Sequence, residues 1–464
     1  MLIPFGSSDW VSSSQNIARF KLRNMYVTEN PSSADGVSRI TRPSLSDPST
    51  IGAGPIAGIW KEAGALSDLM LVVSGTELFL WDEATTPVKI DDLPGTGLVE
   101  FASRADKVLL VRDGIVYETD GFTLTVVAIP DDELISSITA INGYFLLSVA
   151  FSDKFYWIEP SQSAPDALNF ASAERFSDFI VSLRTISDEV WILGSQGVEV
   201  WAPTGDAVIP FERIPGRVYN EGCADSATAR KVTFNGNPGL IWATSKGSVV
   251  LAQGSPQTIS TEAVEELLLA DFSGLRSWYF ERQRRDFYIL TSDSVTFAYD
   301  LQAGLWARWD SYGLGHWAAH VGVQSGRNAY GGDVGSGKVW KLGSDNADSD
   351  GPIVREISGF VSNITRPFPC TFVSLRVNSG WAPDYGYEPV VELRWSDDNG
   401  FTWSPYISTG LGNRGEFDDE VVFRSLGMVK RPGRVFEVRF SEPAGFRLDY
   451  ATLNEYPDAK TSSA

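Results

Sequence analysis

Residues 190–201 have the sequence VWILGSQGVEVW, in which a short polar turn separates two runs of strand-forming residues. Val, Ile and Trp favour strands, and a Gly-containing connection between two such runs is typical of a β-hairpin. The same plan is repeated along the chain. The seven predicted hairpins pair Leu69 to Val73 with Leu78 to Trp81, Val108 to Val111 with Ile115 to Tyr117, Tyr144 to Ala150 with Phe155 to Trp157, Val190 to Leu193 with Val198 to Trp201, Leu240 to Ala243 with Val249 to Ala252, Phe287 to Leu290 with Val295 to Tyr299, and Ala329-Tyr330 with Val339-Trp340.

The hairpins recur at a nearly regular spacing. One marker residue was taken from each: Leu71, Leu109, Leu146, Ile192, Ile241, Ile289 and Ala329. The gaps between consecutive markers are 38, 37, 46, 49, 48 and 40 residues. A period of about 40 to 50 residues with a hairpin in each unit is typical of propeller blades. The pattern predicts an all-β chain with a β-propeller of six or seven blades over residues 55–345. A run of meandering β-sandwiches is the alternative.

The sequence on either side of these hairpins differs in composition and in its pattern of polar and apolar residues. Residues 1–54 are rich in Ser, Asn and Pro, and they predict an N-terminal arm that lies on another surface. Residues 346–358 are polar and turn-forming, which is typical of a linker. Alternating polar and apolar runs over residues 359–458 predict a C-terminal β-sandwich, and residues 459–464 a disordered tail. Within the propeller, residues 260–269 predict one short helix, with hydroxyl caps and acids in its first turn.

The charge balance limits the functions that this chain can have. Its 464 residues include 38 Lys and Arg against 59 Asp and Glu, a formal net charge of −21. Proteins that grip the DNA backbone do so with Lys and Arg, so a basic DNA binder is excluded. Two cysteines, Cys223 and Cys370, are too far apart for a metal-binding pair and are expected to be small buried residues. No secretory signal and no membrane-spanning helix is expected, so we predict no membrane insertion by this chain.

Several residue patterns resemble sites of chemistry. His316 and His320 are the only histidines, but glycines surround them and no third ligand accompanies them, so we expect structural histidines. Asn346, Asp348 and Asp350 resemble the start of a calcium loop, but Ile357 stands where its bidentate Glu belongs. Acidic pairs such as Asp91-Asp92, Asp131-Asp132-Glu133 and Asp418-Asp419-Glu420 are expected to be solvated turns. We therefore predict no catalytic residue, no metal site and no cofactor.

One motif is more specific, because Ser396-Asp397-Asp398-Asn399-Gly400-Phe401-Thr402-Trp403 matches the Asp-box of sialidases and other β proteins. The acid and the hydroxyl groups are expected to hydrogen-bond a hairpin turn, Gly to take a positive φ and Trp to pack beneath it. The residues of this predicted structural hairpin are Ser396, Asp398, Gly400, Thr402 and Trp403. A sialidase-like enzyme is the alternative interpretation, but the motif occurs once and outside the propeller.

Several stretches together resemble the packaged-DNA stabilisation, or tail-nozzle, proteins of short-tailed bacteriophages. The central one is Gly194 to Gly205, GSQGVEVWAPTG. The others, in the same order as in that family, are Leu22 to Tyr26, Thr41-Arg42-Pro43, Glu221 to Ala224, Ile259 to Leu268, Asp286 to Leu290, Val295 to Asp300, Trp306, Leu393 to Trp403 and Arg434 to Phe440. The usual Pro-Gly after the opening is Pro43-Ser44 here, which puts only a local turn in doubt.

The resemblance implies a structural virion protein and not an enzyme. Six copies would form a homo-hexameric nozzle ring below the portal and its adaptor protein, retain packaged DNA and serve as a conduit for genome ejection. It would carry distal needle, fibre or tailspike proteins, let double-stranded DNA pass without specific binding, and assemble in the host cytoplasm before residing in the phage tail. We expect Phe20, Leu22, Met25 and Tyr26 to contact a neighbouring subunit or the adaptor.

Two other functions stay open at the level of sequence. A propeller that binds or processes carbohydrate would use exposed tryptophans such as Trp306 and Trp309, which the simpler interpretation packs between blades. A propeller scaffold for host proteins is the third possibility.

Overall fold

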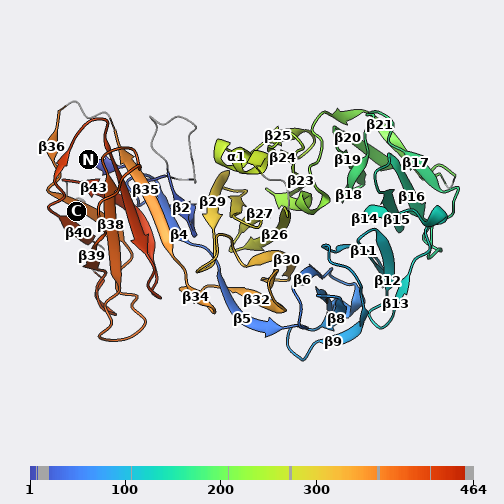
Figure 1. Cartoon of the computed structure of the whole chain (residues 1–464), viewed down its shortest axis with the longest axis horizontal. Helices are drawn as coiled ribbons and strands as arrows, with labels where there is room; N and C mark the ends of the chain where they lie inside the picture. The colour runs from blue at the N-terminus through green and yellow to red at the C-terminus, as the bar shows by residue number, and fades with distance from the viewer. Residues whose placement is uncertain are drawn as a thin grey trace, which may run out of the picture.

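Seven groups of four antiparallel strands are arranged as the blades of a ring in the computed structural model (Figure 1). The structure describes residues 1–6, 8, 20–105, 107–206, 208–270, 274–362, 366–417 and 420–454. Nearly all of its regular elements are strands. The prediction of a β-propeller is confirmed, and the number of blades is seven.

From the innermost strand outward, the blades are composed as follows. Blade 1 is β6 (Ile56–Trp60), β7 (Met70–Ser74), β8 (Glu77–Trp81) and β9 (Val88–Asp92); blade 2 is β10 (Glu100–Arg104), β11 (Lys107–Arg112), β12 (Ile115–Thr119) and β13 (Leu124–Val126); blade 3 is β14 (Ile135–Ile141), β15 (Tyr144–Val149), β16 (Lys154–Ile158) and β17 (Phe170–Ser172). Blade 4 is β18 (Ile180–Ile186), β19 (Glu189–Gly194), β20 (Val198–Pro203) and β21 (Phe211–Tyr219); blade 5 is β22 (Arg230–Phe234), β23 (Asn237–Ala243), β24 (Val249–Ala252) and β25 (Pro256–Thr258). Blade 6 is β26 (Arg276–Arg282), β27 (Arg285–Thr291), β28 (Thr296–Asp300) and β29 (Leu305–Trp309); blade 7 is β30 (Ala319–Ser325), β31 (Asn328–Asp333), β32 (Lys338–Gly343) and β5 (Ser44–Thr50).

The seven predicted hairpins are the two middle strands of the seven blades. The core follows the same order, because separate clusters of buried apolar side chains fill the spaces between neighbouring blades. The predicted short helix is α1 (Glu262–Ala270), which buries Val264 and Leu268 against blades 5 and 6. Three single-turn 3-10 helices complete the ring: η1 (Leu66–Asp68), η2 (Pro130–Asp132) and η3 (Ser226–Thr228).

The ring is closed by a strand from the N-terminal region. Strand β5 pairs antiparallel with β32, so that Ser44 lies opposite Gly343 and completes blade 7. The prediction of a strand-poor arm over residues 1–54 is therefore wrong for residues 22–50. It failed because β5 is polar and contains Pro48, as an outer strand allows, and because its partner lies about 300 residues away.

The remaining strands form a two-sheet sandwich beside the propeller (Figure 1). One sheet has the order β3 (Met25–Glu29), β4 (Val37–Thr41), β43 (Arg447–Leu453), β37 (Phe372–Val377) and β40 (Glu420–Arg424), with β1 (Leu2–Ile3) also on β43. The other has the order β2 (Leu22–Arg23), β35 (Arg355–Val361), β42 (Arg434–Phe440), β38 (Val390–Ser396) and β39 (Ile407–Gly410). Two short pairs join them: β33 (Ala347–Asp348) with β34 (Gly351–Pro352), and β36 (Phe368–Pro369) with β41 (Met428–Val429). N-terminal and C-terminal strands thus share both sheets.

The sandwich is fused to the propeller by continuous hydrogen bonding. Strand β2 pairs in parallel with β29 of blade 6 and antiparallel with β35, which makes one nine-stranded sheet across both parts. The predicted linker over residues 346–358 includes the pair β33–β34 and the start of β35, so its second half belongs to the sandwich. The tail predicted for residues 459–464 lies outside the described residues.

Buried charged side chains stabilise the junction between the sandwich and the propeller. Arg42 is fully buried and pairs with Asp348, with Nη2 and Oδ2 2.6 Å apart. Its Nε donates to the side-chain oxygen of Asn24 at 2.9 Å, and Asn24 donates in turn to Asp310 at 2.8 Å. The remaining Arg42 donors meet the carbonyls of Pro43 and Asp310. We call these side chains, Arg42, Asp348, Asn24 and Asp310, the junction cluster.

Candidate functional site

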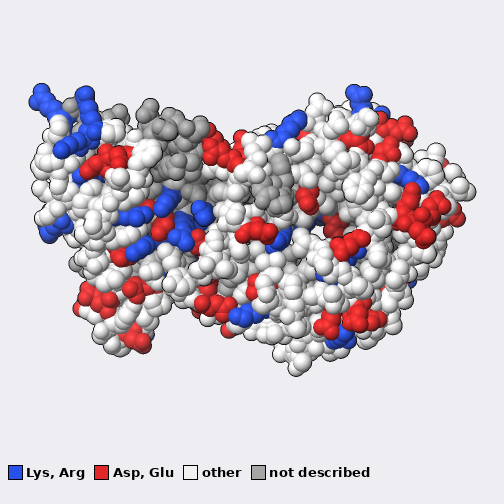
Figure 2. All heavy atoms as spheres, viewed as in Figure 1, with Lys and Arg blue, Asp and Glu red and all other residues white. Residues whose placement is uncertain are grey.

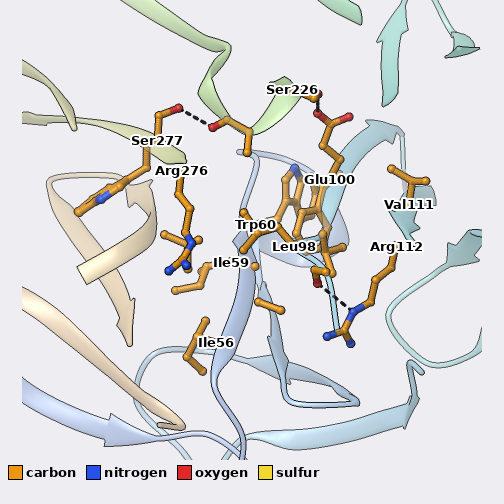
Figure 3. Close-up of a pocket in the computed structure, with 18 of the residues that line it drawn as sticks. Ile56, Ile59, Trp60, Leu98, Glu100, Val111, Arg112, Ser226, Arg276 and Ser277 are labelled. Atoms are coloured by element: carbon orange, nitrogen blue, oxygen red, sulfur yellow. Dashed lines mark hydrogen bonds between the residues drawn. The ribbon is translucent and has the colours of Figure 1, made fainter. Parts of the chain in front are cut away.

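The innermost strands of all seven blades surround a central cavity of about 1090 Å³ (Figure 3). Propellers commonly bind ligands or partners near this axis, because loops and strand ends of every blade converge on it. Apolar residues such as Ile56, Ile59 and Leu98 form part of its wall. The charged side chains in the wall are Lys61, Arg112, Arg184, Arg230, Lys231 and Arg276, with Glu100, Asp113 and Asp225.

A side-chain bridge in the wall of this cavity links blade 2 to blades 3 and 4 and to the segment before blade 5. Glu100 of β10 pairs with Arg184 of β18 at 2.5 Å and accepts a hydrogen bond from Ser226, which precedes blade 5 (Figure 3). Its other oxygen accepts from the Ser137 hydroxyl at 2.8 Å and the Ile138 amide at 3.0 Å. One carboxylate therefore ties blades 2, 3 and 4 to the segment that precedes blade 5.

The electrostatics of the bridge favour the ionised acid. Burial raises the pKa of Glu100, but the charge of Arg184 and the hydrogen bonds from Arg184, Ser226 and Ile138 outweigh it, so the pKa lies below its ordinary value. Arg184 is itself saturated, because its other donors meet the carbonyls of Ala229, Leu183 and Ser226. Glu100 and Arg184 form a closed unit that holds a fixed geometry at the axis.

Three arginines of the innermost strands recur at a constant interval. Arg184, Arg230 and Arg276 are spaced 46 residues apart, one on each of blades 4, 5 and 6. Each reaches the next blade: Arg184 donates to the Ala229 carbonyl, Arg230 to the Ser277 carbonyl at 3.0 Å, and Arg276 contacts the His320 ring. The sequence analysis missed this set, although the 46-residue interval between arginines was a signal that could have found it.

The two histidines lie together at the blade 6–7 boundary and face the last of these arginines. Their ring centroids are 4.6 Å apart, and His320 is buried. Burial, with the charges of Arg276 and His316, lowers the pKa of His320 to about 3. His320 is therefore neutral at physiological pH and packs as a structural side chain. In the part of the chain that the structure describes, no group of three His, Cys, Asp or Glu side chains is placed to hold a metal ion.

The cysteines and the calcium-like loop occupy structural positions. Cys223 and Cys370 are both free and buried, as predicted, and burial raises the pKa of Cys223 to about 12 and of Cys370 to about 11. In the loop, Asp348 pairs with Arg42, and Asp350 pairs with Lys338 at 3.0 Å. These acids are thus engaged by cations of the chain itself.

The Asp-box residues lie in the turn between β38 and β39. Asp398 accepts from the Ser396 hydroxyl at 2.6 Å and from the Thr402 amide at 2.8 Å. Gly400 has a φ of +96°, and the Trp403 indole donates to its carbonyl at 3.0 Å. The hydrogen bonds of Asp398, first from Ser396 and then from Thr402, lower its pKa to about 2. The motif closes a hairpin.

The predicted contact residues and the tryptophans of the alternative function are mostly internal. Leu22, Met25 and Tyr26 belong to the core shared by the sandwich and blades 6 and 7, whereas Phe20 is half-buried. Leu22, Met25 and Tyr26 are therefore not available for a neighbouring protein, because their strands are interior elements and not an arm. Trp306 and Trp309 are fully buried, and the Trp306 indole donates to the Ile259 carbonyl at 2.7 Å. Of the acidic pairs, Asp418 and Asp419 lie outside the described residues.

Exposed apolar side chains lie elsewhere, in loops that the sequence analysis did not single out. Phe122, Leu168 and Val208 are 82%, 83% and 82% exposed. Each lies between the third and fourth strands of its blade, on blades 2, 3 and 4 in turn. Equivalent loops of consecutive blades lie on one face of a propeller, so these three side chains share one rim. We call them the apolar rim.

The distribution of charge differs between the two parts of the molecule. In Figure 2, Asp and Glu gather over the outer parts of the propeller, whereas a group of Lys and Arg lies where the sandwich approaches it. In the described residues no helix is both long and apolar enough to cross a membrane.

These features define a class: a seven-bladed β-propeller with a bridged axis, fused to a sandwich, whose motifs are structural. Within that class, the chain matches the family described as "Bacteriophage P22 Gp10, beta-propeller" over residues 11–347. This match covers most of the chain. The chain belongs to this family of phage packaged-DNA stabilisation proteins, as the resemblance in the sequence indicated, and is a virion-associated structural protein.

Other comparisons add little. No curated protein matches the chain. Similar solved structures include YCF48 bound to D1 peptide, with 12% identity, a TM-score of 0.41, and coverage of 66% of this chain and 100% of that chain. The extracellular domain of the putative one component system BT4673 from B. thetaiotaomicron has 8% identity, a TM-score of 0.45, and coverage of 84% and 56%. The Cps50 (Swd1) β-propeller domain of Myceliophteria thermophila has 9% identity, a TM-score of 0.41, and coverage of 64% and 98%.

Proposed function

We propose that this chain is the subunit of a phage tail nozzle, a homo-hexameric ring below the portal and its adaptor protein that retains packaged DNA and conducts it during ejection. Membership of the phage family is the observation that carries the proposal. In this function the distal face of the ring carries needle, fibre or tailspike proteins. The chain is made and assembled in the host cytoplasm and then resides in the tail.

The bridged axis supports a conduit between subunits and not through them. The Glu100–Arg184 bridge lies in the wall of the cavity at the propeller axis, and this cavity has a volume of about 1090 Å³. Duplex DNA has no path through such a space. A channel for DNA therefore has to be enclosed by several copies of the chain, which is what a ring provides.

The net charge supports passage without tight binding. At −21 for one chain, a ring of six subunits is strongly acidic overall. Acidic walls repel phosphates, whereas Lys and Arg would retain DNA by releasing its counterions. DNA would slide along such a wall under the pressure of packaging or ejection.

The apolar rim supports a contact between copies. Exposed apolar side chains that share one face of a protein are candidates for a contact with another protein. Phe122, Leu168 and Val208 provide such a set on three neighbouring blades. We assign the rim to the neighbouring subunit of the ring.

Electron microscopy of the native assembly tests the proposal. A tag on this chain would recover the assembly from particles or from producing cells. We expect a sixfold ring with an axial channel, joined to a larger ring assembly. Isolated propellers without partners would contradict the nozzle function, and glycan binding would then be the next activity to measure.

A pair of matched variants tests the subunit contact. Leu168→Glu together with Val208→Glu places two charges on the rim, so we expect folded chains that no longer form rings. Leu269→Glu alters a 65% exposed side chain on α1, away from the rim, and should leave ring formation intact. Rings formed by the rim variant, or DNA retention in particles that contain the variant and lack rings, would contradict the proposal.

A further inference from the structure

We propose that the central cavity of the propeller binds a small oxyanion with two or more negative charges, held by Arg230 and Lys231 of the innermost strand of blade 5. This site is distinct from any DNA conduit, because it lies inside one subunit. The inference does not depend on the nozzle function.

The cavity wall is cationic in a strongly acidic protein. Six Lys and Arg but three Asp and Glu side chains contribute to it, whereas the whole chain has 38 against 59. An enclosed surface of one sign focuses the field and concentrates ions of the opposite sign.

Most of these charges are already satisfied by the protein. Lys61 pairs with Glu83 at 2.5 Å, Arg276 pairs with Asp293 at 2.6 Å, and Arg184 pairs with Glu100. Arg112 donates to three backbone carbonyls, those of Gly97, Gly75 and Leu93. These cations are fixed parts of the wall.

Arg230 and Lys231 are different. Arg230 uses Nε on the Ser277 carbonyl at 3.0 Å and Nη1 on the Ala229 carbonyl at 2.8 Å, both neutral acceptors. Among the residues that the structure describes, neither Arg230 nor Lys231 has a carboxylate within ion-pair distance, and the Lys231 amine has no hydrogen-bond partner. Half-buried Arg230 and exposed Lys231 thus line the cavity without an ion-pair partner, although Glu100 and Asp225 attract Arg230, and Glu62 attracts Lys231, from further away.

The protein environment disfavours the charge that these side chains carry. Burial, and then the repulsion of Arg184, lowers the pKa of Arg230 to about 10. Burial also lowers the pKa of Lys231, which Arg184 lowers further although Glu62 opposes it. An anion between Arg184, Arg230 and Lys231 would relieve this repulsion. Charge-assisted hydrogen bonds of guanidinium and ammonium groups are the usual means of holding phosphate or carboxylate groups.

The cavity has a volume typical of small-molecule sites. Ser136, Ser226 and Ser277 also belong to its wall, but their hydroxyl groups hydrogen-bond Ser148, Glu100 and the Ala227 carbonyl. Arg230 and Lys231 are therefore the groups of the wall that remain for anion oxygens.

Isothermal titration calorimetry with inorganic phosphate tests this site on the full chain. The buffer is low in salt and free of phosphate, because salt screens such contacts. We expect the wild type to bind phosphate. Lys231→Gln and Arg230→Gln should each weaken binding by at least about tenfold, the effect of one charge-assisted hydrogen bond.

Two further variants make the result specific. Lys246→Gln removes the same charge from the turn between β23 and β24 of blade 5, outside the cavity wall, where Lys246 pairs with Glu221 at 3.5 Å, and should leave the affinity unchanged. Glu100→Gln removes the counter-charge of Arg184 and should strengthen binding. Circular dichroism verifies folding, and Lys231→Gln carries the test if Arg230→Gln unfolds. No binding by the wild type at millimolar phosphate, or an equal loss in Lys246→Gln, would overturn the proposal.

Discussion

The junction cluster and the Glu100–Arg184 bridge of the central cavity are made of the same kinds of side chain. They differ in how fully each charge is paired with an opposite charge or a hydrogen-bond acceptor. At the junction, Arg42 meets both oxygens of Asp348 and three further acceptors, and neither side chain reaches solvent. In the central cavity, Glu100 and Arg184 pair with each other, but Arg230 and Lys231 have no ion-pair partner among the described residues. The difference separates a charge cluster that holds the fold from one that has capacity left for a ligand.

Both clusters sit where chain segments distant in sequence meet. Arg42 and Asp348 are separated by 306 residues, and Glu100 and Arg184 by 84. Each charged pair therefore fixes the relative position of elements that hydrophobic burial alone would leave free to slide. A charge without its partner at such a position is costly, because water cannot replace the partner.

Breaking the junction cluster should have the largest effect. Asp348→Asn leaves the Arg42 guanidinium buried without a counter-charge, so we expect the free energy of unfolding to fall by about 3–5 kcal/mol. Urea denaturation followed by tryptophan fluorescence measures this change.

Asp350→Asn is the matched control, two residues further along the same loop. Asp350 is 53% exposed and pairs with an exposed Lys338, so its loss should cost at most about 1 kcal/mol. Equal effects of the two substitutions would show that the junction cluster does not hold the two parts together.

Removing the carboxylate of Glu100 in the central cavity should lower the free energy of unfolding by an intermediate amount. Glu100→Gln abolishes the charge that Arg184 meets but keeps a neutral acceptor, so we expect a loss of about 2 kcal/mol. Because the pKa of Glu100 is lowered in the folded chain, this stability is present above the unfolded value of 4.5 and is lost as the pH falls below it. The difference between wild type and variant should therefore shrink in acid.

Glu77→Gln provides the comparison for this second prediction. Glu77 pairs with Lys89 on the outer part of blade 1, and both side chains are largely solvated. Its loss should change the free energy of unfolding by less than about 1 kcal/mol. A Glu100→Gln variant as stable as Glu77→Gln would mean that the bridge contributes nothing to closing the ring.

The sequence was sufficient for the parts of the fold that carry a local signal. The middle strands of each blade are short apolar runs joined by tight turns, as in Val190 to Leu193 and Val198 to Trp201, so all seven hairpins could be predicted. The Asp-box was found for the same reason, since Ser396 and Thr402 act within a few residues of Asp398.

The rest depends on pairing over long distances, which local patterns do not reveal. Strand β5 is polar, and nothing near it in sequence indicates that it completes blade 7. Met25 and Tyr26 are buried because their strand pairs with β4 and, through it, with the C-terminal β43, a contact that the sequence around them does not indicate. The cations of the central cavity could not be predicted from local patterns, because only the closed ring brings residues 100, 184 and 230 to one axis.

Replacing an exposed acid should have the smallest effect on stability of the three substitutions. Asp398 of the Asp-box is fully solvated, but it accepts hydrogen bonds from Ser396 and Thr402 that lower its pKa to about 2. Asp398→Asn should lower the Tm slightly and speed hydrogen exchange in the β38–β39 turn, whereas Asp384→Asn in a neighbouring loop should do neither. The contribution of Asp398 is present above its unfolded pKa of 3.8 and is lost as the pH falls through about 2, so the wild type and the variant should converge in strong acid. A Tm difference that persists unchanged at that pH would mean that the shape of the Asp398 side chain, and not its charge, stabilises the turn. The exposure of Asp348, Glu100 and Asp398 would then no longer explain the order of the three effects.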